Sequence, residues 1–127
     1  MKTIVLDAGA LIAVERGSPA VRGYVLLADR GHATLTTSSA VVAQVWRGGS
    51  RQARLARLLA SDLMTELALD SEASRRIGAL AASAPDARDV VDGHVAIIAL
   101  ERDAVVLTSD PEDIARWGVP GGNIIPC

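Results

Sequence analysis

Two short apolar runs in this sequence each end at a carboxylate. Ile4-Val5-Leu6 is followed by Asp7, and "AVVLTSD" ends at Asp110. Two further acids, Asp89 and Asp92, stand three residues apart in "DVVDGHVAIIALE", at the start of an apolar stretch. Carboxylates crowded at one place repel and raise one another's pKa unless a cation neutralises them. If these acids meet in the fold, we therefore expect them to hold a cation.

The residue types indicate which cation this would be. The cluster contains acids without His or Cys ligands, and carboxylate oxygens suit Mg²⁺ or Mn²⁺ rather than zinc. Mg²⁺ is commonly held by one or two carboxylates together with substrate phosphates. Metal-bound water, or a second ion about 4 Å away, supports in-line attack on a phosphodiester. The acids therefore point to phosphoryl chemistry.

Each acid taken alone also has a structural explanation. An aspartate at a helix start caps free N–H groups and contributes about 0.5–2 kcal/mol. Asp7 and Asp92 stand where helices would begin, and Asp110 precedes Pro111 as a turn residue would. Capping is favoured for any one of them, whereas the set of acids together favours a cation site.

Alternating strands and helices must position these acids. Strands are expected over about 2–6, 33–37, 63–67, 104–110 and 123–126. Helices are expected near 8–16, 19–30, 39–47, 51–60, 71–80, 89–102 and 111–117. Thr37 or Ser38 would cap the third helix, and Asp70 or Ser71 the fifth.

This alternation predicts an α/β fold with a mostly parallel sheet of four or five strands, covered by helices on both faces. In such sheets the functional crevice lies outside the carboxyl ends of the strands. Asp7 and Asp110 both fall at those ends.

The totals exclude several classes of protein. The 127 residues are 50% hydrophobic without Phe, which predicts a single domain over 1–127 with an aliphatic core. The formal net charge of -2 neither indicates nor excludes nucleic-acid binding through a local patch. Cys127 alone allows no intrachain disulfide, and no apolar run approaches the roughly 18 residues of a membrane span. We expect a soluble protein of the cytoplasm that does not bind membranes.

Four segments occur in an order and spacing typical of one known family. They are "IVLDAGALIA", "SSAVVAQVWRGG", "DVVDGHVAIIA" and "VVLTSDPEDIARW", and they extend over essentially the whole chain. Together they resemble the PIN domain, and the chain looks like a VapC-type toxin of bacterial toxin-antitoxin pairs. The resemblance implies an α/β/α sandwich, an endoribonuclease dependent on Mg²⁺ or Mn²⁺, a homodimer, and a small VapB-like antitoxin whose tail occupies the acidic groove.

The same resemblance assigns roles to single residues. The matching family acids are Asp7, Asp92 and Asp110, the expected catalytic metal ligands, with Asp89 and Asp113 as extra acids found in some members. Thr108 or Ser109 is expected to orient Asp110.

One family acid is missing. Its position is taken by Gln44, which keeps the length and an acceptor oxygen but lacks the negative charge, so metal affinity should fall. Three explanations stay open: a natural variant in which Asp89 or Asp113 supplies the charge, a weakened enzyme, or a deliberate substitution that makes a toxic protein tolerable to its host. We favour the first.

Other residues have competing interpretations. One helical stripe of arginines is a candidate for contact with RNA phosphates or an acidic partner, although a solvated face is more common: Arg47, Arg51, Arg54 and Arg57. Trp46 is expected to anchor the core or an interface rather than to stack on a base. A general-acid role for His94 is disfavoured, because a helix points it away from Asp92.

Two other functions compete with the nuclease. A receiver-type signalling module would also bind Mg²⁺ at this sheet edge, but its middle strand should end in an acid and here ends in "LTTSS". A PIN fold without strong catalysis would serve as an RNA-binding or antitoxin-binding module, which Gln44 supports.

Overall fold

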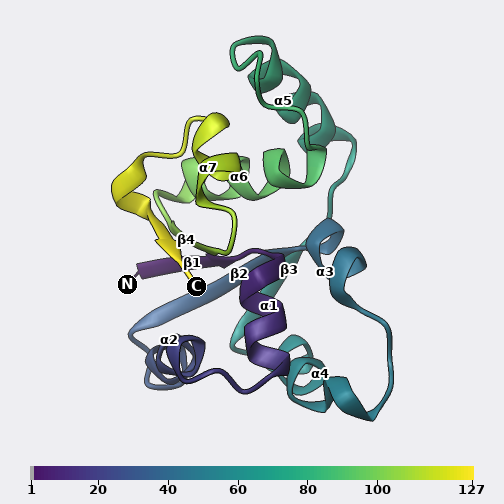
Figure 1. Ribbon diagram of the computed structural model, residues 1–127, viewed down its shortest axis with the longest axis vertical. Helices are drawn as coiled ribbons and strands as arrows, with labels where there is room; N and C mark the ends of the chain where they lie inside the picture. Colours follow the sequence, from purple (N-terminus) through teal and green to yellow (C-terminus); the bar gives the residue numbers. More distant parts are fainter. Residues whose placement is uncertain (1) are drawn as a thin grey trace.

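A parallel sheet of five strands lies at the centre of the computed structural model, which describes residues 2–127 (Figure 1). The strands are β1 (Lys2–Leu6), β2 (Ala33–Ser38), β3 (Met64–Leu67), β4 (Val105–Thr108) and β5 (Ile124–Pro126), in the spatial order β3-β2-β1-β4-β5. Every neighbouring pair is parallel. The predicted α/β fold with a parallel sheet is therefore confirmed.

The helices cover both faces of this sheet. They are α1 (Ala8–Glu15), α2 (Pro19–Asp29), α3 (Ser39–Val45), α4 (Ala53–Ala60), α5 (Ser71–Ala82), α6 (Val90–Arg102) and α7 (Pro111–Arg116), with short 3-10 turns η1 (Ser50–Gln52) and η2 (Gly121–Asn123). In Figure 1, α1, α2 and α4 lie on one side of the sheet, and α5, α6 and α7 lie on the other. Within residues 2–127, no helix is long and apolar enough to cross a membrane.

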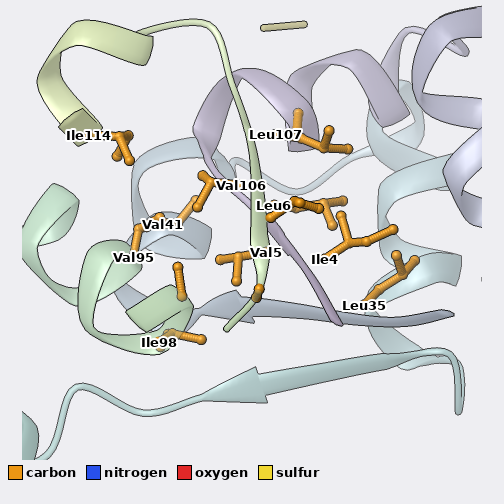
Figure 2. Packing of buried hydrophobic residues seen from close by; sticks show 14 of the residues in the cluster. Ile4, Val5, Leu6, Leu35, Val41, Val95, Ile98, Val106, Leu107 and Ile114 are labelled. Atoms are coloured by element: carbon orange, nitrogen blue, oxygen red, sulfur yellow. The ribbon is translucent and has the colours of Figure 1, made fainter. Parts of the chain in front are cut away.

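The core is aliphatic, as the composition predicts. Figure 2 shows Val95 and Ile98 of α6 beside Val5 of the central strand, all of them buried. Each fully buried side chain of this kind contributes about 1.5–3 kcal/mol. Gly93 brings Trp117 against the same helix, because a Cβ at Gly93 would lie 2.8 Å from the indole ring. Helix α6, which carries Asp92, is therefore packed tightly on the sheet.

Two helix caps are decided by the structure. The Ser38 hydroxyl accepts a hydrogen bond from the amide of Ala40 at the start of α3, and the Asp70 carboxylate accepts one from Ala73 at the start of α5. The neighbouring candidates, Thr37 and Ser71, do not serve as the N-caps.

The third and fourth predicted helices differ from the structure. Helix α3 stops at Val45, and the backbone at Trp46 is extended. The predicted helix over 51–60 begins as the 3-10 turn η1, so only 53–60 is α-helical. The Gln52 side chain explains both differences, because its amide donates to the Val45 carbonyl and its Oε1 accepts the amides of Arg47 and Gly48. These bonds satisfy backbone groups that a longer helix would have used.

Candidate active site

Asp7 lies at the carboxyl end of the central strand and is only 4% exposed. It occupies the N-cap position of α1, yet its side chain makes no capping hydrogen bond. Its Oδ2 instead accepts a hydrogen bond of 2.7 Å from the Thr108 hydroxyl on β4. Helix capping therefore does not explain this buried carboxylate.

Threonines on both neighbouring strands hold the end of β1. The Thr108 hydroxyl donates to Asp7 and accepts the backbone amide of Asp110, 2.9 Å away. From β2, the Thr37 hydroxyl donates to the carbonyl of Leu6, 2.8 Å away. The chain after β4 is thereby tied to Asp7, and Thr37 is a contributor that the sequence alone did not indicate.

Ser109, the other predicted supporting residue, packs against the first turn of α1. A Cβ at Gly9 would lie 2.3 Å from the Ser109 hydroxyl oxygen. The two segments can approach this closely only because Gly9 has no side chain.

The two acids of α6 have different surroundings. Asp89 is the N-cap, and its Oδ1 accepts the amides of Val91 and Asp92 at 2.8 and 3.3 Å. Asp92 lies in the first turn of the helix and is half-buried. The capping explanation therefore holds for Asp89 and not for Asp92.

The predicted acids act on one another through charge repulsion, which is clearest in the pKa of Asp92. Burial, followed by the negative charges of its neighbours, raises the pKa of Asp92 to about 7. Those neighbours are, in decreasing order of effect, Asp89, Asp7, Asp113 and Asp110. Since this repulsion weakens with distance, the four other acids lie near enough to Asp92 for their charges to act on it.

The pKa of Asp7 is also raised, chiefly by burial. The hydrogen bond from Thr108 and the backbone amide of Ala8 oppose this rise, while the charges of Asp110 and Asp89 add to it. Asp7 thus stands in a desolvated and electronegative position.

The donor chemistry fits a hard divalent cation, because all the gathered groups are carboxylates. However, of the carboxylates, imidazoles and thiols in residues 2–127, no three stand close enough to hold one ion together. Two of the acids also have other partners: Asp113 pairs with Arg116, and Asp89 caps α6. Asp7, Asp92 and Asp110 are left as donors.

Gln44 is exposed on the last turn of α3 and lines a groove. The groove has a volume of about 500 Å³ and runs between α1, α3 and η1. Arg47 and Arg51 line it as well.

The predicted arginine stripe is divided between two sites. Arg54 does not line this groove. It lies over Gly17, and its guanidinium donates a hydrogen bond of 3.4 Å to the Glu15 carbonyl. It lines a second groove between α1, α2 and α4. The stripe is interrupted because Arg47 lies in a loop and Arg51 in a 3-10 turn.

Trp46 is 43% exposed, so of its two expected roles the core anchor is wrong and the interface anchor stays a prediction. Its indole is available to an interface or a ligand. His94, by contrast, is buried, its Nδ1 lies 2.6 Å from the Ser38 hydroxyl, and burial lowers its pKa. This hydrogen bond joins α6 to the end of β2.

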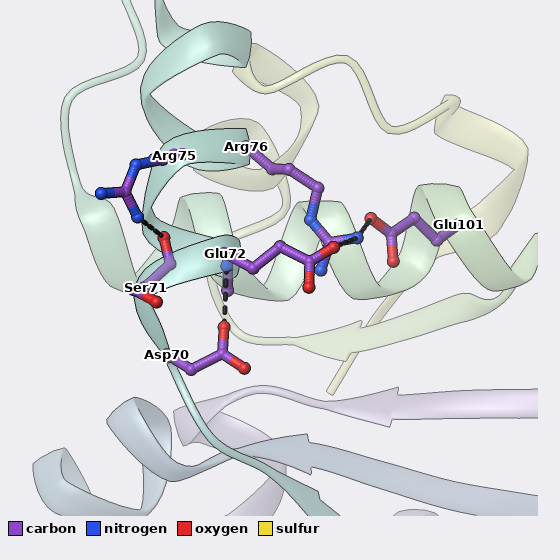
Figure 3. Close-up of polar contacts among 7 residues, drawn as sticks. Asp70, Ser71, Glu72, Arg75, Arg76 and Glu101 are labelled. Atoms are coloured by element: carbon purple, nitrogen blue, oxygen red, sulfur yellow. Dashed lines mark hydrogen bonds and ion pairs between the residues drawn. The ribbon is translucent and has the colours of Figure 1, made fainter.

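Polar contacts also hold α5 against α6. Figure 3 shows Arg76 between Glu72 on its own helix and Glu101 on α6. The N–O distances of these two ion pairs are 3.8 and 2.8 Å. Such exposed pairs contribute about 0–1 kcal/mol, so they support the position of α6 only weakly.

Comparison with known proteins agrees with this geometry. The PIN domain family model matches residues 4–118, and PIN nucleases generally use divalent metal ions. Among solved structures, VapBC2 from Rickettsia felis bound to a DNA fragment from their promoter is similar, with a TM-score of 0.73 over 98% of each chain and 16% identity. No curated protein matches the sequence. The match over most of the chain places this protein in the PIN-domain family.

Proposed function

We propose that this protein is a metal-dependent endoribonuclease and the toxin of a VapBC-type toxin-antitoxin pair. The observation that carries the proposal is the placement of the buried Asp7 at the end of the central strand, without a capping role, near Asp89, Asp92 and Asp110, whose negative charges repel its own. Such repulsion is relieved when a divalent cation binds. Membership of the PIN-domain family supports the same conclusion.

Asp7, Asp92 and Asp110 would hold Mg²⁺ or Mn²⁺, one or two of them directly and the remainder through the waters that Mg²⁺ keeps, because no three acids among residues 2–127 are close enough to bind one ion directly. When bound, the ion would supply a Lewis acid and an activated water for attack on an RNA phosphodiester. Thr108 contributes because its hydroxyl bonds both to the Asp7 carboxylate and to the Asp110 backbone amide, which keeps the two residues near each other. The burial of Asp7 strengthens its attraction for a cation.

Gln44 need not abolish this activity. Asp89 and Asp113 both raise the pKa of Asp92, so each places negative charge near the proposed ligands although each also has another role. This supports the explanation in which they supply the charge that Gln44 lacks.

We also propose a small VapB-like antitoxin as a partner and a homodimer as the working form. The solved VapBC2 complex from Rickettsia felis supports the first, and the exposed Leu26 and Leu27 offer apolar surface for such contacts. A toxin that cuts RNA would act in the cytoplasm.

The test is cleavage of a labelled structured RNA by the purified protein, with Mn²⁺, Mg²⁺ or EDTA. We expect cleavage with Mn²⁺ or Mg²⁺ and its loss in Asp7→Asn. Asp62→Asn makes the same chemical change at an exposed position outside the cluster and should retain activity.

Gln44 favours one second candidate, a PIN-fold module that binds RNA or antitoxin with weak or no catalysis. Absence of cleavage in both the wild type and Gln44→Glu, with RNA binding intact, would establish this candidate and overturn the nuclease. Activity confined to Gln44→Glu would identify a weakened enzyme.

A further inference from the structure

A groove rich in arginine lies along α1, the helix that begins directly after Asp7. Its cationic side chains are Arg16 at the end of α1, Arg47 in the loop after α3, and Arg51 in η1. Its near wall includes Ile12, which follows Asp7 by five residues on the same helix, about 7.5 Å of helix rise. One wall of the groove therefore lies within about two turns of Asp7 along α1.

The positive charge of this groove is largely uncompensated. Across residues 2–127, the arginines that form ion pairs are Arg76 and Arg116, so Arg16, Arg47 and Arg51 have no carboxylate partner. The chain as a whole carries a formal charge of -2, so three cations in one groove are a local concentration of positive charge. Such a patch attracts anions.

Glu15 is the one carboxylate that lines the groove, and it is already engaged. Its Oε1 accepts a hydrogen bond of 2.6 Å from Nε2 of Gln52. Three cations thus face one carboxylate.

The wall that carries two of these arginines is held in place from inside. Gln52 is 5% exposed, and its side chain bonds to the backbone of Val45, Arg47 and Gly48. These hydrogen bonds of Gln52 fix the backbone positions of Arg47 and Arg51. Guanidinium groups carried on a fixed stretch of backbone favour a ligand with several anionic oxygens, since arginine binds phosphate in a bidentate manner.

The lining favours a nucleic-acid strand over an acidic protein segment. Apart from Ile12 and Val45, the groove is lined by polar residues and Gly48, whereas the groove on the other side of α1 contains Val14, Val25, Leu58 and Leu63. A protein helix needs apolar anchors, and a phosphate backbone does not. The exposed indole of Trp46, next to Arg47, adds a surface on which a base can stack.

We propose that this groove binds the backbone phosphates of a single-stranded RNA segment and delivers the adjoining phosphodiester to Asp7. The choice of RNA rests on the proposed function, which it deepens by assigning a path for the substrate. In this proposal Arg16 and Arg51 contact phosphates, Arg47 adds positive charge beside them, and Trp46 stacks on a base.

The test compares two double variants of the full chain. Arg16→Gln with Arg51→Gln removes two cations from the groove, and Arg22→Gln with Arg57→Gln removes two exposed cations from the other groove. Binding of a fluorescein-labelled mixed-sequence single-stranded RNA is measured by anisotropy in EDTA, from about 50 to about 200 mM salt. Cleavage with Mn²⁺ is measured separately.

We expect the first double variant to bind RNA at least tenfold more weakly, with the slope of log K against log salt reduced by about 1.4, or about 0.7 for each lost phosphate contact. The Arg22 and Arg57 control should keep the wild-type slope. Equal slopes in the two double variants would overturn the proposal even if Mn²⁺-dependent cleavage is observed.

The separate readouts distinguish the groove from the nuclease. Arginine-dependent RNA binding without cleavage would support the groove and reject the proposed catalysis. A poly-glutamate peptide that binds the wild type but not the first double variant, while RNA binds both equally, would assign the groove to an acidic protein and overturn the proposal.

Discussion

The Thr108 hydroxyl lies 2.7 Å from Oδ2 of Asp7 and joins two neighbouring strands at the edge where both end. The same oxygen accepts the amide of Asp110. One buried hydroxyl thereby fixes the position of Asp7, after β1, relative to that of Asp110, after β4.

Thr108→Val should destabilise the protein, because the substitution keeps the shape and removes this hydroxyl. The Asp7 carboxylate and the Asp110 amide would each lose a partner, and a buried unsatisfied group costs about 1–3 kcal/mol. Urea denaturation should show a lower free energy of unfolding. Thr34→Val removes an exposed hydroxyl bonded to Thr3 and should change it by less than about 0.5 kcal/mol.

Stability should fall as the pH rises from about 4 toward 7 in metal-free buffer. The folded pKa of Asp92 is raised to about 7 from 3.8, so the folded state binds this proton more tightly, and the resulting stability is complete below the unfolded pKa and lost as the pH rises through the folded one. Because the carboxyl is partly exposed, we expect a loss of about 1–2 kcal/mol rather than the full value of the shift. Denaturation in EDTA at a series of pH values measures it.

Asp92→Asn should flatten this pH dependence and should stabilise the metal-free protein at neutral pH. A slope that persists unchanged in the variant would show that Asp92 does not titrate as its surroundings indicate.

Divalent cations should stabilise the protein at neutral pH. An ion that binds only the folded state adds about 2.7 kcal/mol at a concentration one hundred times its Kd. Thermal denaturation with increasing MnCl₂ should show a rising Tm in the wild type and in Asp62→Asn. The rise should be much smaller in Asp92→Asn, and an equal rise in all three proteins would place the ion elsewhere.

Gly9→Ala should destabilise the protein by about 1–3 kcal/mol, because the new methyl group would overlap Ser109 and push the chain after β4 away from α1. Gly78→Ala is the matched control, since Gly78 is also helical but has open space around its Cα. That substitution should stabilise α5 by up to about 1 kcal/mol. Ser109→Gly should restore part of the stability lost in Gly9→Ala, and failure to do so would contradict the overlap.

Local patterns predicted most of the elements correctly. The apolar run before Asp7 is β1, and the run before Asp110 contains β4, because continuous apolar segments of this length suit strands buried on both faces. The boundaries after α3 were not predictable. They depend on the buried side chain of Gln52, whose partners lie on α1 and α3, and nothing in its neighbours along the chain indicates that it turns inward.

The sequence by itself determined the order of strands and helices, the parallel sheet and the position of Asp7 and Asp110 at the ends of strands, since hydrophobic periodicity and helix caps act over a few residues. Only the tertiary structure decided that Asp89 caps a helix while Asp92 carries a raised pKa, and that Arg51 and Arg54 serve different grooves. Burial and electrostatic repulsion decide such roles, and both depend on groups brought together from distant parts of the chain.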